Sequence, residues 1–382
     1  MRLPWTVLAV CLLSAIACQS VPEPTAEQQL QALVDAAVAD NELIYGVALH
    51  VDSPSVGLDW EGAAGDADPG AGTPMTADRP VRIASNTKTF IAAAVLRLWE
   101  EGRLDLDDPI VMRLSADHTQ MLRDDGYDPQ AITVRHLLTH TSGIFDHTGP
   151  SVYVDSILAD PMHRWTRTEQ LTGTVEWGDP HGSPGEIYTY CDTGYVLLGE
   201  VVERAAERPM AEAVRDLVGF SDLGMGSTWW EILEPPPAEV PDRAHQFLED
   251  LDVYAFDPSY DLYGGGGVAS TVGDLARFWR GLFSSGVYED PGTLETMLTT
   301  IEGTRALDDA SARALPPGAY RMGVWSVEVE GLETYRHSGF WGTLATYVPD
   351  LDLVVTVTVN QNQCGTLMDD LVREAIRVVR DM

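Results

Sequence analysis

The spacing of apolar residues predicts a chain that begins with a helix and two strands. An amphipathic helix is expected over 26–40, because apolar side chains recur there at helical spacing. Two strands are expected next, over 42–51 and 57–65, with the polar segment 52–55 as their turn. A strongly apolar helix is then predicted from Ser85 to Glu101.

The remainder of the chain changes from helical to strand-like spacing. The region from about 103 to 235 is predicted to be mostly helical, and three consecutive prolines mark its end. Four short strands are predicted over 322–329, 333–337, 344–348 and 353–360, followed by a last helix over 367–380. Strands at both ends with helices between them predict an α/β fold of the α+β type. An antiparallel sheet, completed by both termini and flanked by helices, would carry an inserted all-helical region.

The N-terminus has the pattern of an export signal. The apolar run over 7–13 is too short to cross a bilayer as a helix and fits a signal peptide over 1–17. The residues before Cys18 resemble a lipobox, although Ala stands where Leu is usual, and this resemblance implies lipidation of Cys18. We therefore expect a lipid-anchored tether over 18–25 and a folded domain over 26–382. By the same resemblance, Gln19 directly after Cys18 implies that the protein is anchored in the outer membrane, on its periplasmic face, if the cell has one.

The composition limits the possible partners. The 382 residues include 59 acidic and 24 basic side chains, for a formal charge of −35, and 45% of residues are hydrophobic. Such a chain can build a core but cannot present the clustered positive charge that nucleic acid requires. The acidity fits either adaptation to high salt or an ordinary solvated surface. Lys88 is the only lysine, and Lys, unlike Arg, can lose a proton near neutral pH when its pKa is lowered.

The cysteine and histidine pattern indicates no metal site and no cofactor. Once the leader is removed and Cys18 carries lipid, Cys191 and Cys364 remain, and we expect two free thiols. His136 and His140 lie at helical spacing without an accompanying acidic HExxH pattern. Capping or core roles are favoured for both over metal binding.

The lone lysine occurs in a Ser-x-x-Lys motif, from Ser85 to Lys88, at the start of a predicted helix. Residues three apart share a helix face, so Lys88 can take the Ser85 hydroxyl proton. Many helices also begin with a capping Ser and carry a Lys one turn later. The motif by itself favours that capping interpretation.

Two further motifs change this balance. The segment 187–200, with Tyr190 and Asp192, resembles the tyrosine loop and helix of serine penicillin-recognising enzymes, and His337-Ser338-Gly339 resembles their late strand motif, Lys-Thr-Gly or His-x-Gly. Segments 104–109, 132–144 and 265–271 also resemble the class C β-lactamase-related group. Three motifs in this order are far more specific than one. The sequence is identified as a member of that family, whose members include β-lactamases, D-alanyl-D-alanine carboxypeptidases, D-aminopeptidases and carboxylesterases.

The resemblance implies a β-lactamase/transpeptidase-like fold and a set of site residues. Ser85 would be the nucleophile, Lys88 its activating base, and Tyr190 the group that passes a proton to the leaving group. The backbone N–H groups of Ser85 and Phe340 would form the oxyanion hole. Asp192, His337, Ser338 and Gly339 would contact substrate. Phe340 and Trp341 would either line the cleft or cover it, and Tyr188 would pack.

Two departures from the family pattern bear on the substrate. Position 192 is usually Asn, which can donate a hydrogen bond, whereas the Asp192 carboxylate only accepts and would favour protonated Lys88. His337 replaces the lysine of typical class C β-lactamases and is mostly neutral at pH 7, so it holds a substrate carboxylate weakly. Both departures favour an esterase or a D-amino-acid peptidase over an efficient β-lactamase.

The expected protein is thus an exported serine hydrolase that forms an acyl-enzyme on a small ester, D-amino-acid or peptidoglycan-type substrate. A weak β-lactamase or D-alanyl-D-alanine carboxypeptidase is the alternative within the family. A non-catalytic envelope protein that binds peptidoglycan or a partner is the alternative from another class, and Asp192 is the feature that favours it. We expect a monomer.

Overall fold

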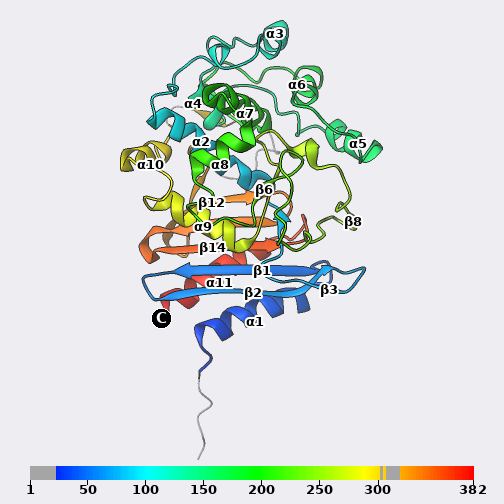
Figure 1. The fold of residues 1–382 in the computed structure, drawn as a ribbon, viewed down its shortest axis with the longest axis vertical. Coiled ribbons are helices and arrows are strands. Elements are labelled where there is room, and N and C mark those ends of the chain that lie inside the picture. The colour runs from blue at the N-terminus through cyan, green and yellow to red at the C-terminus, as the bar shows by residue number, and fades with distance from the viewer. Residues whose placement is uncertain (1–22, 302–303, 307–318) are drawn as a thin grey trace, which may run out of the picture.

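The structure, a computed structural model, describes residues 23–301, 304–306 and 319–382, so the expected signal peptide and Cys18 lie outside the described residues. Its centre is a seven-stranded antiparallel sheet with the order β11-β12-β13-β14-β1-β2-β3 (Figure 1). The strands are β11 (Trp325–Val329), β12 (Leu332–Gly339), β13 (Thr343–Val348), β14 (Leu353–Val359), β1 (Gly46–Ser53), β2 (Leu58–Asp68) and β3 (Thr73–Pro74). Because β1 pairs with β14, the two ends of the chain complete one sheet, as predicted.

Two helices cover one face of this sheet. They are α1 (Ala26–Ala39), which begins with a Thr25 capping box, and α11 (Leu367–Arg380). Their apolar faces pack on alternate residues of β1, including Val47, Leu49 and Val51. The intervening Ala48 belongs to the larger core on the opposite face, where α9 (Val272–Phe283) contacts the sheet. The period-two pattern of the strand therefore separates the two cores.

Most of the remaining helices lie in the upper part of the molecule in Figure 1. The helices are α2 (Thr87–Glu100), α3 (Ala116–Asp124), α4 (Val134–Leu138), α5 (Ser151–Ala159), α6 (Arg167–Glu176), α7 (Asp192–Ala206), α8 (Met210–Val218) and α10 (Pro291–Met297), and the 3₁₀ turns are η1 (Ala84–Asn86), η2 (Ile110–Met112), η3 (Pro258–Asp261) and η4 (Pro349–Leu351). Short strands pair as β4 (Val81–Arg82) with β9 (Val268–Ser270) and β6 (Trp229–Trp230), β5 (Ile187–Tyr188) with β10 (Arg305–Ala306), and β7 (Phe247–Leu248) with β8 (Leu251–Asp252).

Helix α2 is the central element of the larger core. Its residues from Thr87 to Leu96 are all buried, because the helix is apolar around most of its circumference and contacts α7 and α8. The helix was expected to begin at Ser85. In the structure, Ser85 lies in the preceding turn η1, and the α-helix begins at Thr87. The sheet, α2 and α7 together place the candidate site residues.

Candidate active site

The candidate nucleophile lies at a strained turn that leads into α2. Ser85 is 6% exposed, and the residue before it, Ala84, has a φ of 45°. A residue other than Gly adopts this left-handed backbone conformation only at an energetic cost, and such residues often occur at functional sites. The turn brings Ser85 over Lys88, whose Nζ lies 2.9 Å from the Ser85 Oγ.

Lys88 is fully buried and has three acceptors. Its Nζ contacts the Ser85 Oγ, donates to the Gly265 carbonyl at 2.7 Å, and forms an ion pair with the Asp192 carboxylate. Three acceptors match the three N–H donors of an ammonium group. Burial by itself lowers the pKa of Lys88, but the negative charge of Asp192, helped by Tyr190, outweighs burial and raises it. The resting lysine is therefore protonated and donates a hydrogen bond to Ser85.

Asp192 begins α7 and belongs to a carboxylate pair. Its Oδ2 accepts a hydrogen bond from the Thr148 hydroxyl at 3.3 Å, and its backbone N–H donates to Asp146 at 3.1 Å. Burial and the charge of Asp192 raise the pKa of the Asp146 carboxyl. Gly265 permits the close packing here, since a Cβ at that position would lie 2.9 Å from Asp192 Oδ1. Asp192 thus contacts the candidate catalytic lysine, Lys88, as well as the cavity.

Tyr190 lies between β5 and α7, beside the lysine. The Lys88 Nζ is 5.0 Å from the centre of the Tyr190 ring, which packs against His140 and stacks on Trp325. This position agrees with a role next to Ser85 and Lys88. Tyr188 is buried in the same aromatic cluster, as expected for a packing residue.

His337 does not have the substrate-facing position expected from the sequence. It is 1% exposed, its Nδ1 donates to the Ser338 carbonyl at 2.9 Å, and its Nε2 lies 3.3 Å from the Tyr320 hydroxyl. Trp325 and Tyr320 are part of the aromatic cluster beside this ring. In the described residues, His337, Ser338 and Gly339 lie outside the wall of the candidate cavity.

Strand β12 is joined to the nucleophile turn through Asn86. Once the side-chain amide is oriented by its neighbours, its nitrogen donates to the His337 carbonyl at 2.8 Å and its oxygen accepts from the Gly339 N–H at 3.2 Å. A Cβ on Gly339 would lie 2.1 Å from the Ile83 carbonyl oxygen, so only glycine fits where the strand meets the turn. These contacts hold the turn that contains Ser85 against the end of β12, which Phe340 follows directly.

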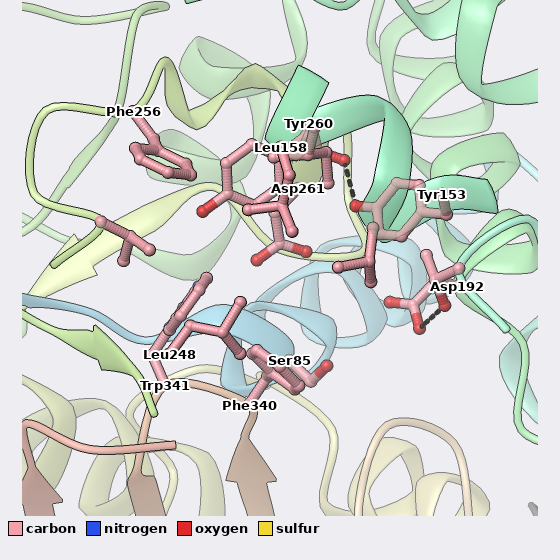
Figure 2. Close-up of a pocket in the computed structure, with 14 residues that line it drawn as sticks. Ser85, Tyr153, Leu158, Asp192, Leu248, Phe256, Tyr260, Asp261, Phe340 and Trp341 are labelled. Atoms are coloured by element: carbon pink, nitrogen blue, oxygen red, sulfur yellow. Dashed lines mark hydrogen bonds between the residues drawn. The ribbon is translucent and has the colours of Figure 1, made fainter. Parts of the chain in front are cut away.

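Ser85 and Phe340 border a cavity of about 190 Å³. Figure 2 shows both residues on one side of it, with Asp261 and Tyr260 on the other. Its walls are mainly aromatic and aliphatic, and its polar groups are few. The lining residues are Ser85, Thr148, Tyr153, Val154, Ile157, Leu158, Asp192, Leu248, Val253, Phe256, Tyr260, Asp261, Phe340 and Trp341. Both Phe340 and Trp341 line the cleft, which decides between the two roles considered for them.

Several site residues were not found from the sequence. Asn86 looked like part of a helix start, Asp146 stands two residues after the 132–144 signature, and Asp261 stands four residues before Gly265. The available signal for Asp146 and Asp261 was their place near family motifs. Only the fold brings their carboxyls towards Lys88.

His136 and His140 have capping and core positions, and the two described cysteines are free thiols, as predicted. His136 accepts the Thr133 N–H in a capping box, and buried His140 accepts the Cys191 N–H at 3.1 Å. Cys191 and Cys364 are free thiols, both buried. In the described part of the chain, no group of three or more His, Cys, Asp or Glu side chains could hold a metal ion.

The fold and the Ser-x-x-Lys site define a penicillin-recognising type of serine hydrolase, and comparison with known proteins gives the family. The beta-lactamase family model matches residues 21–377. Esterase EstB of Burkholderia gladioli is 30% identical over 294 residues, which cover 73% of this chain and 70% of EstB. The D-alanyl-D-alanine-carboxypeptidase/endopeptidase AmpH of Escherichia coli K12 is 25% identical over 238 residues, 62% of this chain and 57% of AmpH. A crystal structure of a D-stereospecific amidohydrolase from Streptomyces sp. has a TM-score of 0.75 at 27% identity, covering 91% of this chain and 98% of that one.

The chain therefore belongs to the beta-lactamase family and is a serine hydrolase. The similar structures also confirm the predicted fold class, a β-lactamase/transpeptidase-like arrangement of helices on an antiparallel sheet. Among the described residues, no helix has the length and apolar character needed to cross a membrane.

Proposed function

We propose that this enzyme hydrolyses small esters or amides through an acyl-enzyme on Ser85. The observation that carries the proposal is the hydrogen bond between the Ser85 Oγ and Lys88 Nζ at the border of an apolar cavity that Phe340 also lines. Hydroxyl and amine lie at hydrogen-bonding distance, as nucleophilic catalysis requires. The cavity can take an apolar group of substrate beside the nucleophile.

In the proposed reaction, the Ser85 oxygen attacks the carbonyl carbon and its proton passes to a neighbouring base. The leaving alcohol or amine departs with a proton, and the acyl group remains on Ser85 as an ester. Water then attacks this ester by the same steps and releases the acid. The N–H groups of Ser85 and Phe340 stabilise the oxyanion formed in each half, a contribution of about 3–4 kcal/mol per donor in other hydrolases.

The state of Lys88 bears on which group takes the Ser85 proton. As an ammonium, Lys88 donates to Ser85 and cannot accept from it. It becomes a base after passing a proton to Asp192, with which it is paired. Tyr190, whose ring lies beside the lysine, is the other proton carrier that we propose.

Charge at the cavity favours esters and amides over β-lactams. The cavity wall includes Asp192 and Asp261 but, among the described residues, neither Lys nor Arg. A β-lactam or a peptide that ends in D-alanine brings a carboxylate, which two acidic side chains would repel. His337, the residue at the position of the family lysine, lies outside the cavity wall. The weak β-lactamase and the carboxypeptidase are therefore the less favoured alternatives.

Labelling with a fluorophosphonate probe tests the proposal directly. We expect the purified domain to form an adduct on the peptide that contains Ser85 and to hydrolyse p-nitrophenyl acetate or butyrate. Ser85→Ala should abolish both, whereas Ser156→Ala, a matched change on α5, should keep them. Full esterase activity in Ser85→Ala would refute the mechanism.

The same experiment separates the enzyme from a protein that only binds. The ion pair of Lys88 with Asp192 favours the binding alternative, because it keeps the lysine protonated at rest. A peptidoglycan- or partner-binding protein would leave Ser85 unlabelled and would retain its ligand in Ser85→Ala.

We propose, in addition, that the protein is exported and anchored in the cell envelope by lipid on Cys18. The support is the sequence pattern described above, an apolar run over 7–13 that ends at small residues and Cys18. Metabolic labelling with a radioactive fatty acid should mark the full chain and fail with Cys18→Ser. Equal labelling of the two would contradict lipidation at this residue.

A further inference from the structure

We propose that the Asp261 carboxyl is a subsite for a protonated amino group, so that the preferred substrates carry an ammonium beside an apolar group. This inference rests on the proposed function, since it names the class of ester or amide that the cavity selects. It concerns a residue outside the three family motifs and separate from the Ser85–Lys88 pair.

The position of Asp261 supports this subsite. Asp261 ends η3 and lies in the cavity wall with Ser85. Figure 2 shows its carboxyl oxygens directed into the space between Tyr260 and Ser85. On its other side the carboxyl packs against the backbone at Gly266, where a Cβ would lie 2.1 Å from Asp261 Oδ2. The side chain is thus held by packing in an orientation towards the cavity.

The cationic side chains near Asp261 are occupied by other partners. Among the described residues, neither Asp261 carboxyl oxygen is paired with a Lys or Arg. Lys88 is committed to Asp192. The Arg82 guanidinium is occupied by Glu231 through Nε at 2.9 Å, by the Val253 carbonyl through Nη1, and by the Phe256 carbonyl through Nη2 at 2.8 Å. Arg243, the other buried arginine nearby, pairs with Glu231 as well.

The surroundings of the Asp261 carboxyl are apolar. Tyr153, Val253 and Trp341 belong to the apolar cluster around this side of the cavity. A carboxylate without a counter-ion is unfavourable there, and burial, together with the charge of Asp192, raises the pKa of Asp261 to about 7. Lys88 and Arg82 act in the opposite direction, and Glu231 adds to the increase. An ammonium from substrate would supply the missing counter-charge and favour the ionised form.

The size of the cavity suits an apolar group. A cavity of about 190 Å³ is larger than the ~150 Å³ apolar cavity that holds benzene in an engineered protein. It can therefore take a benzene-sized or branched aliphatic group next to Asp261. A substrate with both features is an α-amino acyl ester or amide with an apolar side chain. A substrate with a carboxylate at the same place would be repelled.

The test compares substrates that differ only in the amino group. Phenylalanine methyl ester, as each enantiomer, and methyl 3-phenylpropionate are assayed at pH 7.5 with the unchanged protein and with Asp261→Asn. Asn keeps the shape and one accepting oxygen but removes the negative charge. We expect at least a tenfold preference in kcat/KM for one amino ester, and a fall of at least tenfold in that preference in Asp261→Asn. The matched control, Asp250→Asn in the exposed turn between β7 and β8, should leave the preference unchanged.

A binding experiment on Ser85→Ala makes the inference independent of turnover. Phenethylamine and 2-phenylethanol have the same ring and differ in charge, and calorimetry measures their binding. We expect the amine to bind at least tenfold more tightly, and Asp261→Asn in the same background to remove the difference. Equal binding of the two, or a preference that survives Asp261→Asn, would overturn the subsite. If the amine preference is found but no ester is hydrolysed and Ser85 stays unlabelled, the subsite stands and the proposed function fails.

Discussion

The side chains of Lys88 and Asp192 form an ion pair beneath the nucleophile, with the lysine fully buried and the Asp192 carboxylate at the edge of the cavity. The pair joins the start of α2 to the start of α7, two helices that contact each other in the core. It therefore sets the protonation state of the candidate base and also stabilises the packing of the two helices that carry the site. Variants of Lys88 and Asp192 separate these two effects.

Removing the lysine alone should destabilise the protein more than removing both charges. In Lys88→Met, Asp192 keeps a buried charge without its partner, and breaking such a pair typically costs about 3–5 kcal/mol. The double variant Lys88→Met, Asp192→Asn leaves no unpaired charge at this position and should recover a large part of that loss. Urea unfolding followed by circular dichroism measures the free energies. If the double variant is as unstable as Lys88→Met, the pair does not contribute as described.

Asp192→Asn should shift the pH dependence of activity to lower pH. The Asp192 charge raises the pKa of Lys88, so its removal makes the proton on the lysine easier to lose. The acidic limb of the kcat/KM profile should move by about one pH unit or more. Asp250→Asn makes the same change in net charge at the surface and should leave the profile in place. An unmoved profile in Asp192→Asn would show that the Asp192 charge does not control the group that titrates.

Gly339→Ala should disrupt catalysis at the join between β12 and the nucleophile turn. The new Cβ would lie 2.1 Å from the Ile83 carbonyl oxygen and 2.3 Å from the Thr343 Oγ1, distances that force the strand away from the turn. The Phe340 N–H moves with the strand, so kcat should fall about 10²–10³-fold, as for loss of one oxyanion donor. Steady-state kinetics and thermal unfolding are compared with Gly226→Ala, an exposed glycine before β6 that has open space around it and no positive φ. A Gly339→Ala enzyme with normal kcat would contradict this geometry.

The sheet was accessible from the sequence because its strands follow simple rules. The apolar runs of β13 and β14 and the amphipathic helix α11 are found where their spacing predicts them. The two-residue strands β5 and β6 were not predicted, since so short a pairing leaves no periodic pattern and depends on partners far away in the chain.

The site was predictable only where family motifs carry it. Ser85, Lys88 and Tyr190 lie together as their motifs implied. The burial of His337 under Tyr320 depends on a residue with no motif of its own, about seventeen positions away, and could not be read from the strand pattern. Asp261 is likewise one of many acidic residues until the fold places it in an apolar cavity.

The stability of Asp261→Asn relative to the unchanged protein should increase with pH. Burial and the charge of Asp192 raise the pKa of Asp261 from 3.8 to about 7, so the folded state binds its proton more tightly than the unfolded state. The stabilising effect of that proton is complete below pH 4 and is lost as the pH rises towards 7. Asn does not titrate, so the advantage of the variant should grow between pH 4 and 7 and be constant above. Differential scanning calorimetry at pH 5 and pH 8 should show a Tm difference that is larger at pH 8, by about 2 °C or more. Phenethylamine, by supplying a counter-charge, should reduce this difference at pH 8 if Asp261 is its subsite, and a Tm difference that stays constant with pH would show that the Asp261 carboxyl titrates in its ordinary range.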